Sequence, residues 1–254
     1  MRHAAAIAAT PWLRRAQPLL GTLVDIGVCA SGRDSMAAIT AAFATLREVQ
    51  GCLSRFEPDS DVARFHALHR GDGLTVRPAT REVLAAAQAL RQTTDGAFDI
   101  TLGAAPQGWR CDGDRLFKLD DAARLDLGGI GKGYAVDCAV RALIDHGADS
   151  GWVNAGGDLR AFGAAELPVQ LRDETSGGVR PFATLRDGAF ATSHFGRHSR
   201  SQVTAGTHVA AACAHVSVAA PLCLWADALT KVVALSGDTS HPLLARYEAS
   251  AWLH

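Results

Sequence analysis

The spacing of apolar residues changes along this 254-residue chain, and that change most restricts the folds open to it. Three segments before Gly147 place apolar residues three or four positions apart, which is typical of amphipathic helices. After Gly147 the apolar residues fall mostly in short runs with strand character. Helical and strand-like segments do not alternate regularly, so we expect an α+β fold with antiparallel sheets rather than a doubly wound parallel sheet.

Local signals give the boundaries of the expected elements. Asp34 is expected to begin the first long helix, and Ser60 to cap a short second one. The other expected elements are strands over 22–28, 151–163, 168–173, 181–193 and 208–220, helices over 78–96, 134–147, 223–235 and 241–254, and a hairpin turn at Asp187-Gly188.

Composition limits the classes of function. The formal net charge is -1 and the chain has no basic tract, so we expect no binding to nucleic acid or to membrane surfaces. No apolar run reaches the roughly 18 residues of a transmembrane helix. We interpret residues 1–254 as a single domain, with residues 1–17 as a flexible N-terminal extension.

The cysteines indicate the compartment. The six cysteines form no CxxC pair and lie in apolar surroundings, which favours buried reduced thiols in a cytoplasmic protein. The alternative is a periplasmic protein, if the Ala-rich N-terminus is an export signal.

The densest glycine cluster is the run LDLGGIGKGYAVD, residues 125–137. Glycines let backbone N–H groups approach a ligand closely, and the helix expected after Gly133 would favour an anion at its N-terminus. Lys132 would then be a point charge for a phosphate, and Asp137 would accept from a ribose hydroxyl or an adenine amine. The alternative is a tight turn with a solvated lysine.

Three further polar segments have both a chemical and a structural interpretation. The Gly156-Gly157-Asp158 turn is either a close backbone approach to a ligand or a β-bulge. Asp99 and Thr101, in DGAFDIT, either bind a cation or hydroxyl or satisfy their own backbone. Asp227 and Thr230, one helical turn apart, either ligate a hard cation such as Mg²⁺ or form an ordinary helix start.

Taken in order, these motifs resemble the ApbE family, the FAD:protein FMN transferases. The matching segments are GTLVDI, LSRFEPDS, DGAFDITLG, LDLGGIGKGYAVD, VNAGGDL, ATS and ADALT, from about Leu20 to about Leu235. The resemblance implies two closely joined α+β lobes with a flavin groove between them. It also implies Mg²⁺-dependent cleavage of the FAD pyrophosphate, transfer of FMN to a Ser or Thr hydroxyl of an acceptor flavoprotein, and release of AMP.

The resemblance also implies roles for particular residues. Lys132 and Asp137 would hold FAD, with Asp137 near the adenosine. Asp227 would be the main side-chain ligand of Mg²⁺, completed by Thr230 and the carbonyl of Gly131. The other residues expected to bind FAD are Phe56, Asp99, Thr101, Gly129, Asn154, Gly156 and Gly157.

Three positions depart from the family pattern. The metal helix usually reads DALAT, whereas Lys231 stands here four residues after Asp227, where a lysine would oppose or partly replace a cation. Ser193 matches the serine of the TSG motif, but His194 replaces its glycine. The usual HIIDPRTG segment reads HSRSQVTAG, which keeps His198 and loses the Asp-Pro pair.

These departures leave two functional hypotheses. The first is an active FMN transferase in which Ser193, His194 and His198 are the candidate catalytic residues, with a histidine assisting proton transfer from the acceptor hydroxyl. The second is an FAD-binding relative with a lost or altered metal site, which would act as a flavin binder or as an FAD pyrophosphatase.

Overall fold

The computed structural model describes residues 12–29, 34–172, 177–195 and 215–254. Its larger lobe is built on a seven-stranded, fully antiparallel sheet with strand order β1-β2-β6-β7-β8-β9-β10. The strands are β1 (Trp12–Leu19), β2 (Thr22–Cys29), β6 (Gly151–Ala155), β7 (Asp158–Arg172), β8 (Val179–His194), β9 (His215–Ala220) and β10 (Ser250–Leu253).

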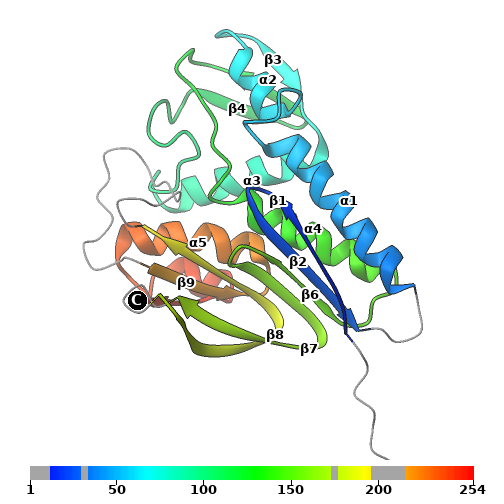
Figure 1. Ribbon diagram of the computed structural model, residues 1–254. Coiled ribbons are helices and arrows are strands. Elements are labelled where there is room, and N and C mark those ends of the chain that lie inside the picture. Colours follow the sequence, from blue (N-terminus) through cyan, green and yellow to red (C-terminus); the bar gives the residue numbers. More distant parts are fainter. Residues whose placement is uncertain (1–11, 30–33, 173–176, 196–214) are drawn as a thin grey trace, which may run out of the picture.

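Three helices pack together against this sheet: α1 (Ser35–Leu53), α4 (Gly131–Asp145) and α5 (Cys223–Ser236). Helix α1 contacts β1 and β2, α4 contacts β6 and β7, and α5 contacts β7, β8 and β9 (Figure 1). The short helix α6 (Pro242–Arg246) precedes β10. The first turns of α4 and α5 lie beside each other.

A smaller lobe lies at one end of α1. It contains a three-stranded antiparallel sheet of β3 (Gly73–Thr75), β5 (Arg115–Lys118) and β4 (Trp109–Asp112), with helices α2 (Asp61–Ala67) and α3 (Pro78–Thr93). Helix α1 contacts α2 and α3 as well as the large sheet, so it joins the two lobes.

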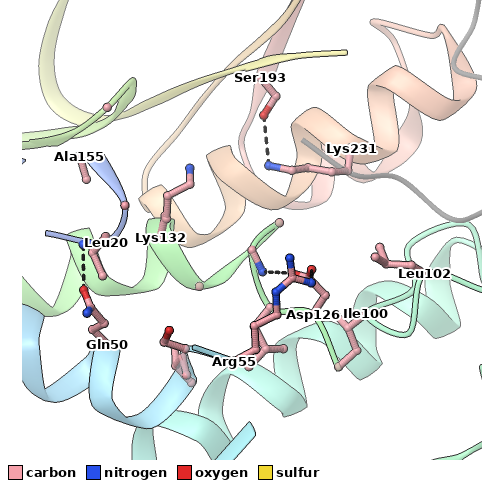
Figure 2. Close-up of a pocket in the computed structure, with 18 of the residues that line it drawn as sticks. Leu20, Gln50, Arg55, Ile100, Leu102, Asp126, Lys132, Ala155, Ser193 and Lys231 are labelled. Atoms are coloured by element: carbon pink, nitrogen blue, oxygen red, sulfur yellow. Dashed lines mark hydrogen bonds and ion pairs between the residues drawn. The ribbon is translucent and has the colours of Figure 1, made fainter. Parts of the chain in front are cut away.

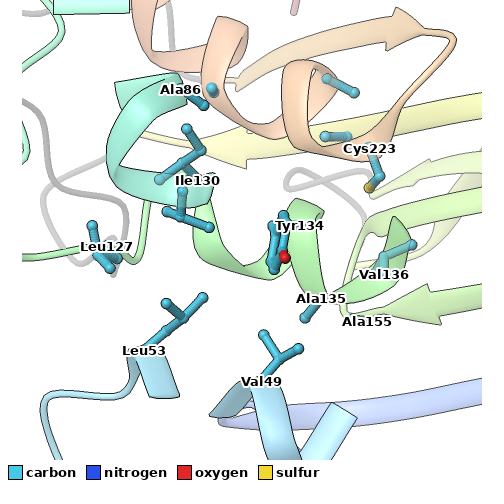
Figure 3. Packing of buried hydrophobic residues seen from close by; sticks show 14 of the residues in the cluster. Val49, Leu53, Ala86, Leu127, Ile130, Tyr134, Ala135, Val136, Ala155 and Cys223 are labelled. Carbon is cyan, nitrogen blue, oxygen red and sulfur yellow. The ribbon is translucent and has the colours of Figure 1, made fainter. Parts of the chain in front are cut away.

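One continuous apolar core runs through both lobes. Figure 3 shows Val49 and Leu53 of α1 pointing towards the segment that holds Ile130 and Tyr134 at the start of α4. The structure therefore confirms an α+β fold with antiparallel sheets.

The expected helix starts in the first half of the chain are confirmed. Asp34 caps α1, since its carboxylate accepts from the Ala37 N–H at 3.0 Å. Ser60 caps α2, with its hydroxyl accepting from the Ala63 N–H at 2.9 Å. Helix α4 begins at Gly131, three residues earlier than expected, so Lys132 lies within its first turn.

Strand β1 was not predicted. Residues 12–17 were expected to belong to a flexible extension, whereas Trp12–Leu19 pairs along its whole length with β2. As an edge strand with no fully buried residue, it lacks the apolar alternation that marks a strand in a sequence. Residues 1–11, which the export-signal alternative needs, lie outside the described residues.

The Asp187-Gly188 hairpin prediction is wrong. Both residues lie inside β8, and pairing with β7 continues on either side of them. Asp187 has a φ of 37°, and the register between β7 and β8 shifts at this point. An Asp-Gly pair accommodates the left-handed conformation of a bulge as readily as that of a turn.

The C-terminal helix prediction is only partly right. Helix α6 spans five residues, after which β10 pairs with β9 at the sheet edge. The three strands of the small sheet were not predicted either, since each has only three or four residues.

No described helix is long and apolar enough to cross a membrane. The five cysteines described are free thiols.

Candidate functional site

A cavity of about 910 Å³ lies between the lobes and is the candidate site. Its walls come from the β1–β2 turn, the C-terminal turn of α1, the β6–β7 turn, the end of β8 and the side of α5 (Figure 2). Residues 54–57, 97–100, 102, 126–129 and 131–132 complete the lining. This volume is near the top of the roughly 300–1,000 Å³ range of small-molecule pockets.

Lys132 brings positive charge to this cavity from the amino end of α4. Its ammonium is paired with the buried Asp158, and its side chain keeps 35% exposure. Burial lowers the pKa of Lys132, but the carboxylates of Asp227 and Asp158 raise it more, so the ammonium keeps its proton. The N-terminus of an α-helix adds its own attraction for anions.

Asp158 is the acidic partner of this pair and lies at the start of β7. Burial, together with the charge of Asp227, raises the pKa of Asp158 to about 6, against the opposing effect of Lys132 and Lys231. This carboxyl therefore loses or gains its proton close to physiological pH.

A second buried pair, Asp227 and Lys231 on α5, lies beside the first. The Lys231 ammonium contacts one carboxylate oxygen of Asp227, and the other oxygen accepts from the Gly133 N–H at 3.1 Å. Burial raises the pKa of Asp227, but Lys132, Lys231 and the Gly133 N–H lower that pKa by more than burial raises it. The Asp227 carboxyl is therefore ionised.

Ser193 and Thr230 complete this cluster. Lys231 also donates to the Asp227 carbonyl at 3.0 Å and to the Ser193 hydroxyl at 3.1 Å, an interaction visible in Figure 2. The hydroxyls of Ser193 and Thr230 are 2.8 Å apart, and Thr230 donates to the Asp227 carbonyl at 2.7 Å.

Seven of the predicted site residues line the cavity. Phe56, at its rim, is 82% exposed, with the Arg55 guanidinium carbon 4.9 Å from its ring centre. Asp99 also lines it, although its carboxylate accepts from Thr101 and the Gly103 N–H. The remaining lining residues from the prediction are Gly129, Gly131, Lys132, Gly156 and Ser193.

Asp137 is not brought to the cavity wall. Its carboxylate accepts from the backbone N–H groups of Cys223 and Leu224 at 3.0 and 2.8 Å and from Arg160 at 2.8 Å. Burial raises its pKa, and these three donors oppose that effect. Asp137 therefore caps the N-terminus of α5, and its predicted contact with an adenosine has no support in this position.

Several other predicted residues support the site from behind. Thr101 holds Asp99, and the Asn154 side chain accepts from the Gly157 N–H at 3.1 Å across the β6–β7 turn. The His194 ring stacks on His215 with centres 4.4 Å apart, and His194 is not among the lining residues. His198 lies outside the described residues.

The residues present do not form an open metal site. Among the described residues, no group of three or more His, Cys, Asp or Glu could hold a metal ion. Asp227 would be the main ligand, yet Lys231 and the Gly133 N–H already occupy its two oxygens. The Thr230 hydroxyl is likewise engaged with Ser193 and the Asp227 carbonyl.

Sequence reasoning missed two ion pairs of the site. The Lys132–Asp158 pair had a signal, since Asp158 ends the Gly-Gly-Asp turn already noted. The Arg55–Asp126 pair, at 2.6 Å on the cavity wall, joins residues 71 positions apart and left no local signal.

Fold and cavity together define a two-lobed α+β protein with a large pocket between the lobes, whose lining includes Lys132 at the amino end of α4. The sequence model of the ApbE family matches residues 20–123 and 110–252. The chain belongs to the ApbE family.

Curated relatives carry one name. An FAD:protein FMN transferase of Treponema pallidum is 26% identical over 229 residues, covering 70% of this chain and 63% of the relative. One from Vibrio cholerae is 25% identical over 177 residues, covering 58% of this chain and 53% of the relative. This chain therefore spans less than two thirds of the length of these relatives.

Solved structures share the fold. The flavin transferase ApbE from Vibrio cholerae superposes with a TM-score of 0.81 at 20% identity, covering 96% of this chain and 93% of that one. The apo flavinyl transferase ApbE of Pseudomonas stutzeri gives 0.82 at 25% identity, covering 97% and 92%. These structures confirm the predicted fold, and the family model confirms the predicted family.

Proposed function

We propose that this chain is an FAD:protein FMN transferase, which binds FAD in the cavity between the lobes and transfers FMN to a Ser or Thr hydroxyl of an acceptor flavoprotein. The observation that carries the proposal is the cavity itself, in which Lys132 lies at the amino end of α4. Family membership and the names of the curated relatives support the same activity.

The lining of the cavity suits the two kinds of chemistry in FAD. An exposed aromatic ring such as Phe56 offers a stacking surface to a planar ring system. Lys132, in the first turn of α4, offers positive charge to a pyrophosphate, and the helix dipole adds to it. Gly129 and Gly156 add bare backbone to the cavity wall.

The transfer exchanges one phosphorus–oxygen bond for another. The acceptor hydroxyl oxygen bonds to the phosphorus of the FMN half, the bond to the AMP phosphate breaks, and the hydroxyl gives up its proton. Negative charge gathers on the phosphate oxygens during this exchange, and fixed positive groups offset it. Lys132 and the amino end of α4 supply that charge. His194 and His198 remain the predicted proton acceptors.

This proposed function does not include the Mg²⁺ requirement that the resemblance implies. Because Lys231 and the Gly133 N–H engage Asp227, no step is assigned to a metal ion. The same observation favours the second candidate function, in which the protein binds FAD without transferring FMN.

A single assay separates these activities. The purified protein is incubated with FAD and an acceptor flavoprotein that carries a target threonine, with Mg²⁺ in one arm and a chelator in the other. We expect AMP in equal amount to an acceptor whose mass has grown by one FMN less one water. The same acceptor with valine in place of the threonine should release no AMP.

The other outcomes assign the alternatives. AMP with free FMN would identify a pyrophosphatase, and bound FAD without AMP would identify a flavin binder. Lys132→Met should lose activity, whereas Arg186→Ala, in an exposed ion pair on the sheet, should keep it. Absence of both FAD binding and AMP release would refute the proposal.

A further inference from the structure

We propose that the ammonium of Lys231 is the resident cation of this site, so that the pyrophosphate of FAD is bound without a divalent metal ion. The inference rests on the proposed function for the identity of the ligand. It concerns the positive charge that the ligand meets, for which the family resemblance implies Mg²⁺ and this chain carries Lys231.

The contacts of Lys231 are those of a small hard cation. Its Nζ is surrounded by a carboxylate and a carbonyl oxygen of Asp227 and by the hydroxyl of Ser193. Oxygen donors of these three kinds also bind Mg²⁺ in proteins. The ammonium satisfies them with its three N–H donors.

The path of the Lys231 side chain places the ammonium at the cavity. Lys231 and Ser193 both line the cavity, and the lysine side chain is only 7% exposed. A Cβ on Gly129 would come within 3.3 Å of Lys231 Cε, so the stem lies directly against the glycine-rich segment. Figure 2 shows the Lys231 ammonium pointing towards Ser193.

The charges near Asp227 are already balanced. Two buried carboxylates, Asp158 and Asp227, face two ammonium groups, Lys132 and Lys231. A divalent ion at Asp227 would have to displace Lys231 or accept its repulsion at contact distance. A pyrophosphate, by contrast, brings negative charge, which the partly exposed Lys132 ammonium and the buried Lys231 ammonium both attract.

Lysine is rare in this chain. Most of its 25 Lys and Arg residues are arginines; the lysines are Lys118, Lys132 and Lys231. Two of those three line the cavity. An ammonium is a compact point charge, which can take a position built for a metal ion where a planar guanidinium cannot.

The test measures FAD affinity by quenching of flavin fluorescence, in excess EDTA and in millimolar Mg²⁺. The wild-type dissociation constant should be the same in both, within about twofold. Lys231→Met should weaken FAD binding in EDTA by about tenfold or more, since the charge is lost and the side-chain length kept. The control Arg186→Ala removes an exposed cation elsewhere and should change nothing.

Lys231→Thr keeps the test informative should the Met variant fail to fold. It places a hydroxyl four residues after Asp227, so its FAD binding should be weak in EDTA and recover on addition of Mg²⁺. Binding of Mn²⁺ alone, followed by its electron paramagnetic resonance, should be undetectable in the wild type and present in this variant.

The results distinguish the two proposals. Wild-type binding that weakens more than about tenfold in EDTA overturns this inference and leaves the proposed function standing. So does a Lys231→Met variant that binds FAD in EDTA as tightly as the wild type. Failure to bind FAD under either condition overturns the proposed function itself and this inference with it.

Discussion

Replacing Gly133 by alanine should separate α4 from α5 and destabilise the protein. Gly133 lies in the first turn of α4, where α4 crosses the start of α5. A Cβ at this position would lie 2.2 Å from the Cys223 carbonyl oxygen and 2.9 Å from the Asp227 Cβ. Because the nearest atom is backbone, relief requires the helices themselves to shift until this distance exceeds at least 3.0 Å.

The size of the effect follows from two opposing contributions. Overpacking a well-packed core costs about 1–3 kcal/mol, and a clash with backbone belongs at the upper end of that range. Alanine in place of glycine within a helix regains up to about 1 kcal/mol. The expected net loss is about 2 kcal/mol of unfolding free energy, or a fall of about 4–8 °C in Tm for a chain of this size.

Urea and thermal unfolding followed by circular dichroism measure this change. The matched control is Gly51→Ala, since Gly51 lies in the last turn of α1 and a Cβ there meets nothing within 4 Å. The control should be unchanged or more stable by up to about 1 kcal/mol. If Gly133→Ala proves as stable as Gly51→Ala, the close approach of α4 and α5 at this glycine is wrong.

Three further predictions concern Asp158, Lys132 and Asp137. Asp158 takes up a proton as pH falls through about 6 and then holds Lys132 less strongly, so FAD should bind more tightly at pH 5 than at pH 7.5. Asp158→Asn should abolish that difference in FAD titrations, and an unchanged pH dependence would contradict it. Lys132→Met should weaken FAD binding by about tenfold or more in the same titrations, with an unaltered affinity as the contrary result. Asp137→Ala should lower the unfolding free energy by about 3 kcal/mol in urea, because Arg160 and the N-terminus of α5 lose their acceptor, while the folded protein should keep its FAD affinity. A stable variant that no longer binds FAD would instead place Asp137 at the ligand.

The parts of the fold that the sequence predicted correctly are those with local causes. Asp34 and Ser60 accept from N–H groups only three residues away, so their capping role shows in the sequence around them. Strand β1 depends instead on pairing with β2, and none of its residues is fully buried. Its side chains therefore carry no burial signal, and only the tertiary structure reveals it.

The same distinction between local and tertiary causes applies to the site. The glycine-rich run, the Gly-Gly-Asp turn and the Asp227 helix were each visible as motifs, and the cavity brings all three together. What the sequence could not give is the direction of each side chain. Asp137 and Gly133 are four residues apart, so both lie on the same face of α4, and that face packs on α5 rather than on the cavity.

The glycine-rich run therefore acts on α5 as much as on any ligand. Gly133 makes room for the Cys223 backbone, and Gly129 makes room for the stem of Lys231. Gly131, whose Cβ would make only ordinary contacts, gives no such clearance. These close approaches let α5 pack near enough to the glycine-rich run for Asp227 to accept from the Gly133 N–H and for Lys231 to reach Ser193. The motif and α5 thus form one unit, in which Gly129 before α4 and Gly133 in its first turn let α5 pack closely enough to bring Lys231 to the cavity.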